Sequence, residues 1–191
     1  MNGERPDLQV IVEMIPQGAR VLDLGCGDGV LLAQLVLQKG VQGRGVEMDE
    51  ANVRACVTKG LSVRHGNIEE GLKDFPEGMF DVVILSQTLA YLNRPLPVLQ
   101  EMARVGRAAI ISLENAGHWR ARWRAMCGDG SGHTLASGQP RVRAITVPQF
   151  YEALRQLELK AEQAVFLRGA SRVARCPFFL ADAAVFKVSK A

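Results

Sequence analysis

A strand-like segment that leads into a glycine loop and then a helix-like segment is the most constraining feature of this sequence. Residues 20–24 are Arg-Val-Leu-Asp-Leu, residues 25–29 are Gly-Cys-Gly-Asp-Gly, and residues 30–34 are Val-Leu-Leu-Ala-Gln. Glycine tolerates positive φ and lets a ligand approach the main chain without a Cβ in the way. The free N–H groups of the following helix would point toward that ligand. The pattern therefore predicts a nucleotide-type cofactor site at the end of the first strand.

The spacing of the glycines indicates which cofactor. The dinucleotide fingerprint has glycines at the first, third and sixth positions of its loop. Here they are Gly25, Gly27 and Gly29, and the sixth position is Val30. Asp23 precedes the loop, where a carboxylate would repel a pyrophosphate but suits an ammonium group. The loop resembles the first motif of class I S-adenosylmethionine (SAM) methyltransferases, in which the acid holds the methionine amino group. The alternative is a glycine turn that only joins a strand to a helix.

Composition favours one globular domain over residues 1–191. Apolar residues make up 48% and charged residues 23% of the 191 residues, as in ordinary globular proteins. The formal charge of +3 is too small to predict a nucleic-acid partner. No apolar run approaches the roughly 20 residues of a membrane span, and the N-terminus lacks an apolar signal core. With four scattered cysteines, these features predict a cytoplasmic protein that does not bind membranes.

Alternating strand-like and helix-like segments predict an α/β fold. We expect a Rossmann-like class I SAM methyltransferase fold, with one seven-stranded, mostly parallel sheet covered by helices on both faces. The last two strands should form a hairpin. The predicted strands are residues 21–24, 43–47, 62–65, 80–85, 108–113, 163–167 and 183–188, and the predicted helices are 7–15, 30–38, 50–58, 95–104 and 149–157. Residues 127–140 are rich in Gly and Ser without periodicity, which predicts a poorly ordered loop.

The end of the second strand offers a carboxylate for an adenosine ribose. Glu47 ends the segment Gly-Arg-Gly-Val-Glu, and one carboxylate can accept hydrogen bonds from both ribose hydroxyls. The alternative is that Glu47 only caps the next helix, but Asp49 fits that capping role better. Met48 would then pack against one face of the adenine.

The loops after the third and fourth strands supply further candidates. Asn67 could accept a hydrogen bond from the adenine amine through its carbonyl oxygen, and the backbone N–H of Ile68 could bond a ring nitrogen. A plain turn asparagine is a serious alternative for Asn67. Ligands in this topology lie at the carboxyl ends of the strands, so Ser86 and Gln87 are predicted to contact the methionyl part of the cofactor.

Other chemistry has weaker support in the sequence. Cys26 lies inside the glycine loop and reads as a small apolar spacer; as part of that loop it is counted among the predicted cofactor-binding residues. The histidines and cysteines lack metal-ligand spacing, so no metal site is expected, and no general base can be assigned.

Trp119 and Trp123 would share a helical face, as would Arg120 and Arg124. That segment is either an amphipathic helix or an anion-binding or docking surface.

Several segments together resemble the methionine biosynthesis protein MetW family, over roughly the first two-thirds of the chain. They include Arg5-Pro6-Asp7-Leu8, the glycine loop with Asp23, Gly45-Val46-Glu47, Leu85-Ser86-Gln87-Thr88-Leu89, Met102-Ala103-Arg104-Val105-Gly106-Arg107 and Gly117-His118-Trp119-Arg120. The resemblance implies a bacterial cytoplasmic protein that binds SAM or S-adenosylhomocysteine. It also implies that the protein works in methionine biosynthesis as a partner of homoserine O-acetyltransferase (MetX).

The resemblance ends just after Trp123. Family members carry a Pro-Val-Thr segment and a Trp-Tyr-Asp-Thr-Pro-Asn-Ile-His run there, whereas this chain has the Gly/Ser-rich loop and keeps only Thr146 and Phe150 of the pattern. A substrate pocket or partner contact built from the missing run would be altered here. Three functions therefore stay open: an acetyltransferase partner, a small-molecule methyltransferase and, with less support, an RNA methyltransferase.

Overall fold

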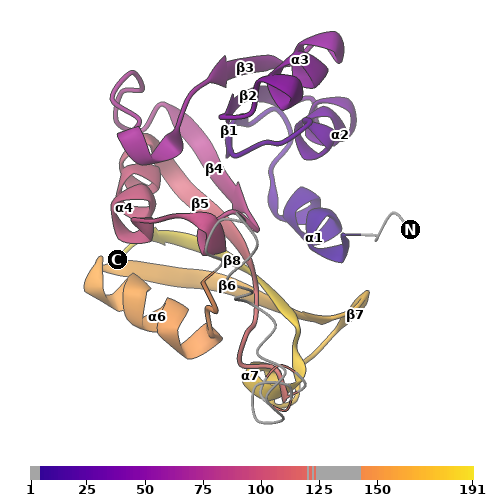
Figure 1. The fold of residues 1–191 in the computed structure, drawn as a ribbon, viewed down its shortest axis with the longest axis vertical. Coiled ribbons are helices and arrows are strands. Elements are labelled where there is room, and N and C mark those ends of the chain that lie inside the picture. The colour runs from indigo at the N-terminus through magenta and orange to yellow at the C-terminus, as the bar shows by residue number, and fades with distance from the viewer. Residues whose placement is uncertain (1–4, 120, 122, 124–142) are drawn as a thin grey trace, which may run out of the picture.

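The computed structural model describes residues 5–119, 121, 123 and 143–191. An eight-stranded sheet forms its centre, in the order β3-β2-β1-β4-β5-β8-β6-β7 (Figure 1). The first five strands in that order are parallel, whereas β8 runs antiparallel to both β5 and β6. The strands are β1 (Arg20–Leu24), β2 (Gln42–Glu47), β3 (Ser62–His65), β4 (Phe80–Ser86), β5 (Gly106–Glu114), β6 (Leu159–Arg168), β7 (Ser171–Arg172) and β8 (Ala183–Lys190).

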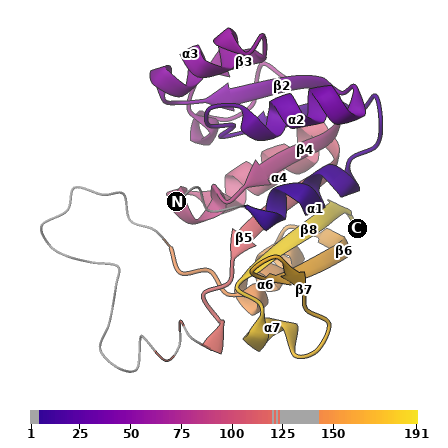
Figure 2. The same cartoon turned by 90° about the vertical axis from the view of Figure 1, so that its right-hand side faces the viewer.

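Helices cover both faces of this sheet. One face carries α1, α2 and α3, and the other carries α4 and α6 (Figures 1 and 2). The longer helices are α1 (Pro6–Met14), α2 (Val30–Lys39), α3 (Glu50–Thr58), α4 (Pro95–Val105) and α6 (Val147–Gln156). Shorter ones are η1 (Ile68–Glu70), η2 (Leu89–Tyr91) and α7 (Pro177–Leu180). Among the described residues, none of the helices has the length and apolar character needed to span a bilayer.

Local sequence explains where these helices begin and end. Asp49 accepts a hydrogen bond from the N–H of Asn52 and caps the N-terminus of α3, as the sequence predicts. Thr146 and Gln149 form a reciprocal capping box at the start of α6. Gly40 ends α2 in the left-handed conformation, at φ 60°.

The central strands are buried on both faces, so alternate residues enter different cores. Val83 and Leu85 of β4 pack in a cluster that includes α4 and α6, whereas Val82 and Ile84 pack in one that includes α1 and α2. This double burial explains why residues 80–85 are almost continuously apolar. The first cluster includes Met102, Phe150 and Phe186, and the second includes Ile11, Leu35 and Ile110.

The predicted fold class is confirmed, with one correction to the strand count. The sheet has eight strands and not seven, because Ser171–Arg172 pairs with β6 as β7. Gly169, at φ 55°, supplies the tight turn that lets these two residues fold back, and two paired residues are too few to give a periodic sequence signal. The prediction of a poorly ordered loop at 127–140 lies outside the described residues.

Asn115 joins three segments that follow the sheet. Its Nδ2 donates hydrogen bonds to the carbonyl oxygens of Phe178 (3.0 Å) and Ala181 (2.9 Å) at α7. Its Oδ1 accepts from the N–H groups of Gly117 (3.0 Å) and Val147 (3.4 Å). With 3% of its surface exposed, this amide replaces water for four backbone groups.

Replacing Asn115 with Ala should lower the free energy of unfolding by about 2–4 kcal/mol, because buried polar groups lose their partner. Urea denaturation followed by circular dichroism would measure the loss. Asn93→Ala is the matched control, since Asn93 is exposed and its amide donates one bond to Glu69; its loss should stay below about 1 kcal/mol. Equal losses in the two variants would contradict the bridging role of Asn115.

Candidate functional site

The candidate site lies where the order of the parallel strands reverses. β1 is followed in the sheet by β2 and β3 on one side and by β4 and β5 on the other. In open α/β sheets, ligands bind at the carboxyl ends of strands at such a switch point. The glycine loop, Glu47, Asn67 and Ser86 all follow or end strands at this edge. The topology thus gathers residues that are up to about sixty positions apart in the sequence.

The three glycines of the loop have different neighbours. A Cβ on Gly25 would lie 2.9 Å from Thr88 Oγ1, and a Cβ on Gly29 would lie 2.5 Å from Leu61 Cδ1. These two glycines therefore allow close packing of the chain itself. Gly27, at φ 56°, has no atom within 4 Å of the position of its Cβ, so its open side is where a ligand can approach the main chain.

Glu47 ties the end of β2 to the glycine loop. Its Oε2 accepts a hydrogen bond from the N–H of Gly27 at 2.8 Å, and its Oε1 accepts from Met48 and Asp49 at 2.9 Å each. These bonds use about three of the four acceptor positions of a carboxylate and fix its orientation. Its assignment as the ribose ligand stays a prediction.

Asp23 is a buried acid with an unsatisfied oxygen. Its exposed fraction is 2%, and its Oδ1 has no hydrogen-bond partner among the described residues. Burial raises the pKa of Asp23 to about 7; the positive charge of Arg5 opposes this rise and the negative charge of Glu47 adds to it. A buried acceptor without a partner, at the end of the strand that leads into the glycine loop, fits a cationic donor such as the ammonium group of SAM.

Cys26 packs as a small side chain between the loop and β2. Its sulfur lies 2.6 Å from where a Cβ would stand on Gly45, and 8% of the residue is exposed. Burial, together with the charge of Asp23, raises the pKa of the Cys26 thiol far above its usual range. The thiol therefore stays protonated and is unsuited to act as a nucleophile.

The predicted adenine-binding residues occupy the loop after β3. Asn67 Oδ1 accepts a hydrogen bond from the N–H of Glu69 at 2.9 Å and caps η1. The side chain of Ile68 packs in the core, whereas Met48 is 66% exposed. Asn67 thus fills the role of a turn asparagine, with a second acceptor position left on its oxygen. Contacts of all three with adenine stay predictions.

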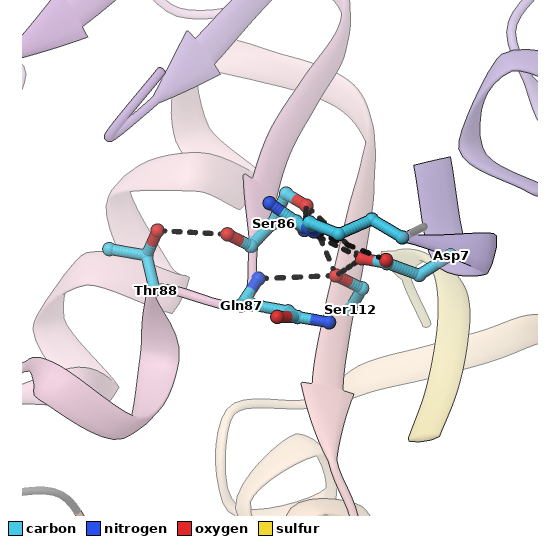
Figure 3. A network of polar contacts seen from close by, with 6 residues as sticks. Asp7, Ser86, Gln87, Thr88 and Ser112 are labelled. Carbon is cyan, nitrogen blue, oxygen red and sulfur yellow. Dashed lines mark hydrogen bonds and ion pairs between the residues drawn. The ribbon is translucent and has the colours of Figure 1, made fainter. Parts of the chain in front are cut away.

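Ser86 ends β4 and Gln87 follows it, and both belong to a polar network (Figure 3). Ser86 Oγ lies 2.6 Å from Arg5 Nη2 and 3.2 Å from Ser112 Oγ. Gln87 has φ 53°, a conformation that costs about 1–2 kcal/mol in a residue with a side chain. Its N–H donates to Ser112 Oγ at 3.1 Å, which helps to hold that conformation. Contacts of Ser86 and Gln87 with a methionyl group stay predictions.

Three members of this network, Arg5, Asp7 and Ser112, are not among the site residues predicted from the sequence. Asp7, which is fully buried, accepts a hydrogen bond from Ser112 Oγ at 2.8 Å and pairs with Arg5 at 2.7 Å. Arg5 and Asp7 belong to the segment that carries the family resemblance, which was the available signal. Nothing in the sequence pattern places α1 beside the ends of β4 and β5.

Two other predictions concern the segment with Trp119 and Trp123, and metal binding. Trp123 is 59% exposed, so it is not the buried tryptophan of an amphipathic helix; Arg120 and Arg124 lie outside the described residues. Within the described part of the chain, no group of three or more His, Cys, Asp or Glu could hold a metal ion.

Comparison with known proteins identifies the family. A model of the family described as methionine biosynthesis protein MetW matches residues 5–188. The chain belongs to the MetW family. The match covers the glycine loop, strands β1 to β7, residues 183–188 of β8, and the network residues Arg5, Asp7, Ser86 and Ser112. The family resemblance read from the first two-thirds of the sequence is therefore confirmed and extends almost to the end of the chain.

One curated relative of the chain carries the MetW name, and another is named as a methyltransferase. The bifunctional methionine biosynthesis protein MetXA/MetW of Rhodopirellula baltica is 33% identical over 174 residues, which are 84% of this chain and 28% of that protein. A ubiquinone biosynthesis O-methyltransferase of Maricaulis maris is 32% identical over 111 residues, 55% of this chain and 39% of the relative. The chain thus spans well under half the length of these relatives.

A solved structure agrees with the fold. A SAM-dependent methyltransferase from Archaeoglobus fulgidus superposes with a TM-score of 0.72 at 17% sequence identity, covering 96% of this chain and 91% of that one. At this identity the likeness establishes the fold alone. The MetW family member therefore has the Rossmann-like class I SAM methyltransferase fold.

The buried acid makes a pH dependence testable. The pKa of Asp23 is about 7 in the fold, against 3.8 for an ordinary aspartate, so its contribution to stability is complete below about pH 4 and is lost as pH rises through about 7. Asp23→Asn replaces the titrating acid with a neutral amide, so the variant should not lose this stability as pH rises. Between pH 4 and pH 8 the stability of the variant relative to the wild type should rise by roughly 2–4 kcal/mol, measured by urea denaturation of the ligand-free protein.

Asp28→Asn is the control for this measurement. Asp28 lies in the adjacent glycine loop, and its pKa is lowered chiefly by a hydrogen bond from Lys59. The stability contributed by Asp28 is present above its unfolded pKa and lost only as pH falls, so this variant should show no relative rise between pH 4 and pH 8. If the difference in stability between Asp23→Asn and the wild type does not change with pH, the ionisation of Asp23 does not destabilise the fold, and the prediction is wrong.

Proposed function

We propose that this chain is a SAM-binding protein of methionine biosynthesis that acts with homoserine O-acetyltransferase (MetX). The observation that carries the proposal is the Rhodopirellula baltica relative, a single protein named for both MetXA and MetW, of which this chain matches 28%. Two functions joined in one protein favour a functional association when they occur on separate chains. MetW family membership over residues 5–188 supports the same pathway.

SAM binding is supported by the geometry of the switch point. Asp23 offers a buried acceptor for the ammonium group, and Gly27 offers an open stretch of main chain. Glu47, oriented by three backbone N–H groups, borders that stretch and is assigned to the ribose hydroxyls. Asn67 with Ile68 is assigned to adenine, and Ser86 with Gln87 to the methionyl end. S-adenosylhomocysteine would use the same groups.

A second candidate is methyl transfer to a small molecule. The similarity to a ubiquinone biosynthesis O-methyltransferase, 32% identity over 111 residues, favours it. Conversion of SAM to S-adenosylhomocysteine, detected by mass spectrometry in the presence of candidate acceptors, would establish this activity. Salt-dependent binding of RNA would instead favour an RNA methyltransferase.

Gly27→Ala should weaken SAM binding at least about tenfold, a loss of about 1.4 kcal/mol, because the new methyl group occupies the side from which the ligand approaches. Isothermal titration calorimetry with SAM measures the change. Gly18→Ala is a matched control: Gly18, at φ 68°, also has no atom within 4 Å of its Cβ position, but it precedes β1 at the opposite edge of the sheet.

Both alanine variants adopt a left-handed conformation, so each should lose about 1 kcal/mol of stability. Gly18→Ala should nevertheless bind SAM like the wild type. Unchanged binding in Gly27→Ala, or an equal loss in both variants, would contradict the assignment of the loop.

The partnership predicts that the chain forms a complex with the homoserine O-acetyltransferase of its own organism and raises its activity. Purified proteins would be mixed with and without SAM, separated by size-exclusion chromatography, and assayed for acetyl transfer from acetyl-CoA to homoserine. Co-elution and increased activity are the expected results. If the two proteins elute separately and the acetyltransferase rate is unchanged in both conditions, the partner function is wrong, whatever the outcome for SAM binding.

A further inference from the structure

Arg5 is a cation held in place at the edge of the candidate site. Its Nη2 donates to Asp7 Oδ2 at 2.7 Å and to Ser86 Oγ at 2.6 Å, and its Nε donates to Asp7 Oδ1 at 3.3 Å. A guanidinium has five N–H donors. The two on Nη1 make no hydrogen bond to any described residue, and 40% of the side chain is exposed. Arg5 therefore keeps a pair of donors available to a ligand.

The position of Asp7 makes this arrangement rigid. Its side chain is 1% exposed, and Ser112 Oγ donates to it at 2.8 Å. Ser112 also accepts the N–H of Gln87, so the ends of β4 and β5 and the start of α1 are joined through one carboxylate (Figure 3). An arginine fixed by its counter-ion loses little conformational freedom when it binds a second anion.

Arg5 also lies near Asp23, the buried acid that precedes the glycine loop. Asp23 is paired in register with Ile84 of β4, two residues before Ser86, so Ser86 and the Arg5 guanidinium border the same strand ends. The positive charge of Arg5 counteracts the rise in the pKa of Asp23, as a nearby cation does. The site thus presents a basic and an acidic side chain close enough for their charges to interact.

We propose that Arg5 binds the α-carboxylate of the ligand while Asp23 binds its α-ammonium group, so that the site selects ligands that end in an intact α-amino acid. Asp7 is the positioning residue that aims Arg5. The inference rests on the proposed SAM binding and adds a specificity to it. Arginine suits this role because its planar donors match a carboxylate.

Two ligands that differ in one group test the assignment. SAM carries the α-carboxylate, and decarboxylated SAM lacks it but keeps the adenosine, the sulfonium and the amine. Calorimetric titrations would use the wild type, Arg5→Met, Arg5→Lys and the control Arg155→Met. Arg155 is 78% exposed and ion-paired on α6, away from the strand ends that form the site. Thermal unfolding would confirm that each variant is folded.

The wild type should bind SAM more tightly than decarboxylated SAM. Arg5→Met should weaken SAM binding roughly 10- to 100-fold, the range expected when a charge-assisted hydrogen bond is lost. Binding of decarboxylated SAM should change less than about threefold. Arg5→Lys should recover part of the loss, because it restores the charge without the planar donors, and Arg155→Met should match the wild type.

Other outcomes would overturn the inference. Equal weakening of both ligands by Arg5→Met would show that Arg5 only anchors α1 through Asp7. Unchanged binding of SAM by Arg5→Met would show that Arg5 does not contact the ligand. If the wild type binds SAM and decarboxylated SAM equally, the site does not select the carboxylate, although SAM binding itself stands. If the wild type binds neither, the proposed SAM binding is wrong and this inference with it.

Discussion

The conformation of the glycine loop depends on close packing around most of its main chain. Thr88 crowds Gly25, Leu61 and Cys56 crowd Gly29, and the N–H of Gly27 is held by Glu47. These neighbours come from the end of β2, from α3 and the residue before β3, and from the segment after β4, so the loop can keep its shape only when the parallel strands are in register. The open side of Gly27 is what this packing leaves for a ligand. The site is therefore a product of the sheet and not of the loop alone.

Much of the fold could be predicted from the sequence. Strands buried on both faces, such as residues 80–85, and the capping residue Asp49 give local signals that need no tertiary information. The fold class followed from such signals, and the family followed from the resemblance of segments such as Arg5-Pro6-Asp7-Leu8 and the glycine loop. The two-residue strand β7 could not be predicted, because its pairing with β6 depends on a turn at Gly169 and not on any periodic pattern. The sequence also does not reveal that Asn67 and Glu47 satisfy backbone groups of the protein itself.

The polar network beside the loop shows a second limit of sequence reasoning. A buried aspartate in the first helix is unexpected, since its side chain needs partners that lie far along the chain. Ser86 and Ser112 look like ordinary polar ends of apolar strands until α1 places Asp7 between them. Two charged groups therefore lie near the loop. The Oδ1 of Asp23 has no hydrogen-bond partner among the described residues, and the Nη1 of Arg5 has donors that bond to none of those residues. That pairing of opposite charges gives the site a polarity that suits a zwitterion.

The contact between Asp7 and Ser112 also bears on the order in which the molecule is assembled. The two residues are 105 positions apart, so the hydrogen bond closes a long segment of chain and costs more loop entropy than the neighbouring helix caps. During synthesis, α1 leaves the ribosome before β5. The carboxylate of Asp7 is therefore made before Ser112, which donates a hydrogen bond to it. The hydrogen bond between these two residues can therefore form only after β5 has been made. Until then, the carboxylate that holds Arg5 lacks one of its partners.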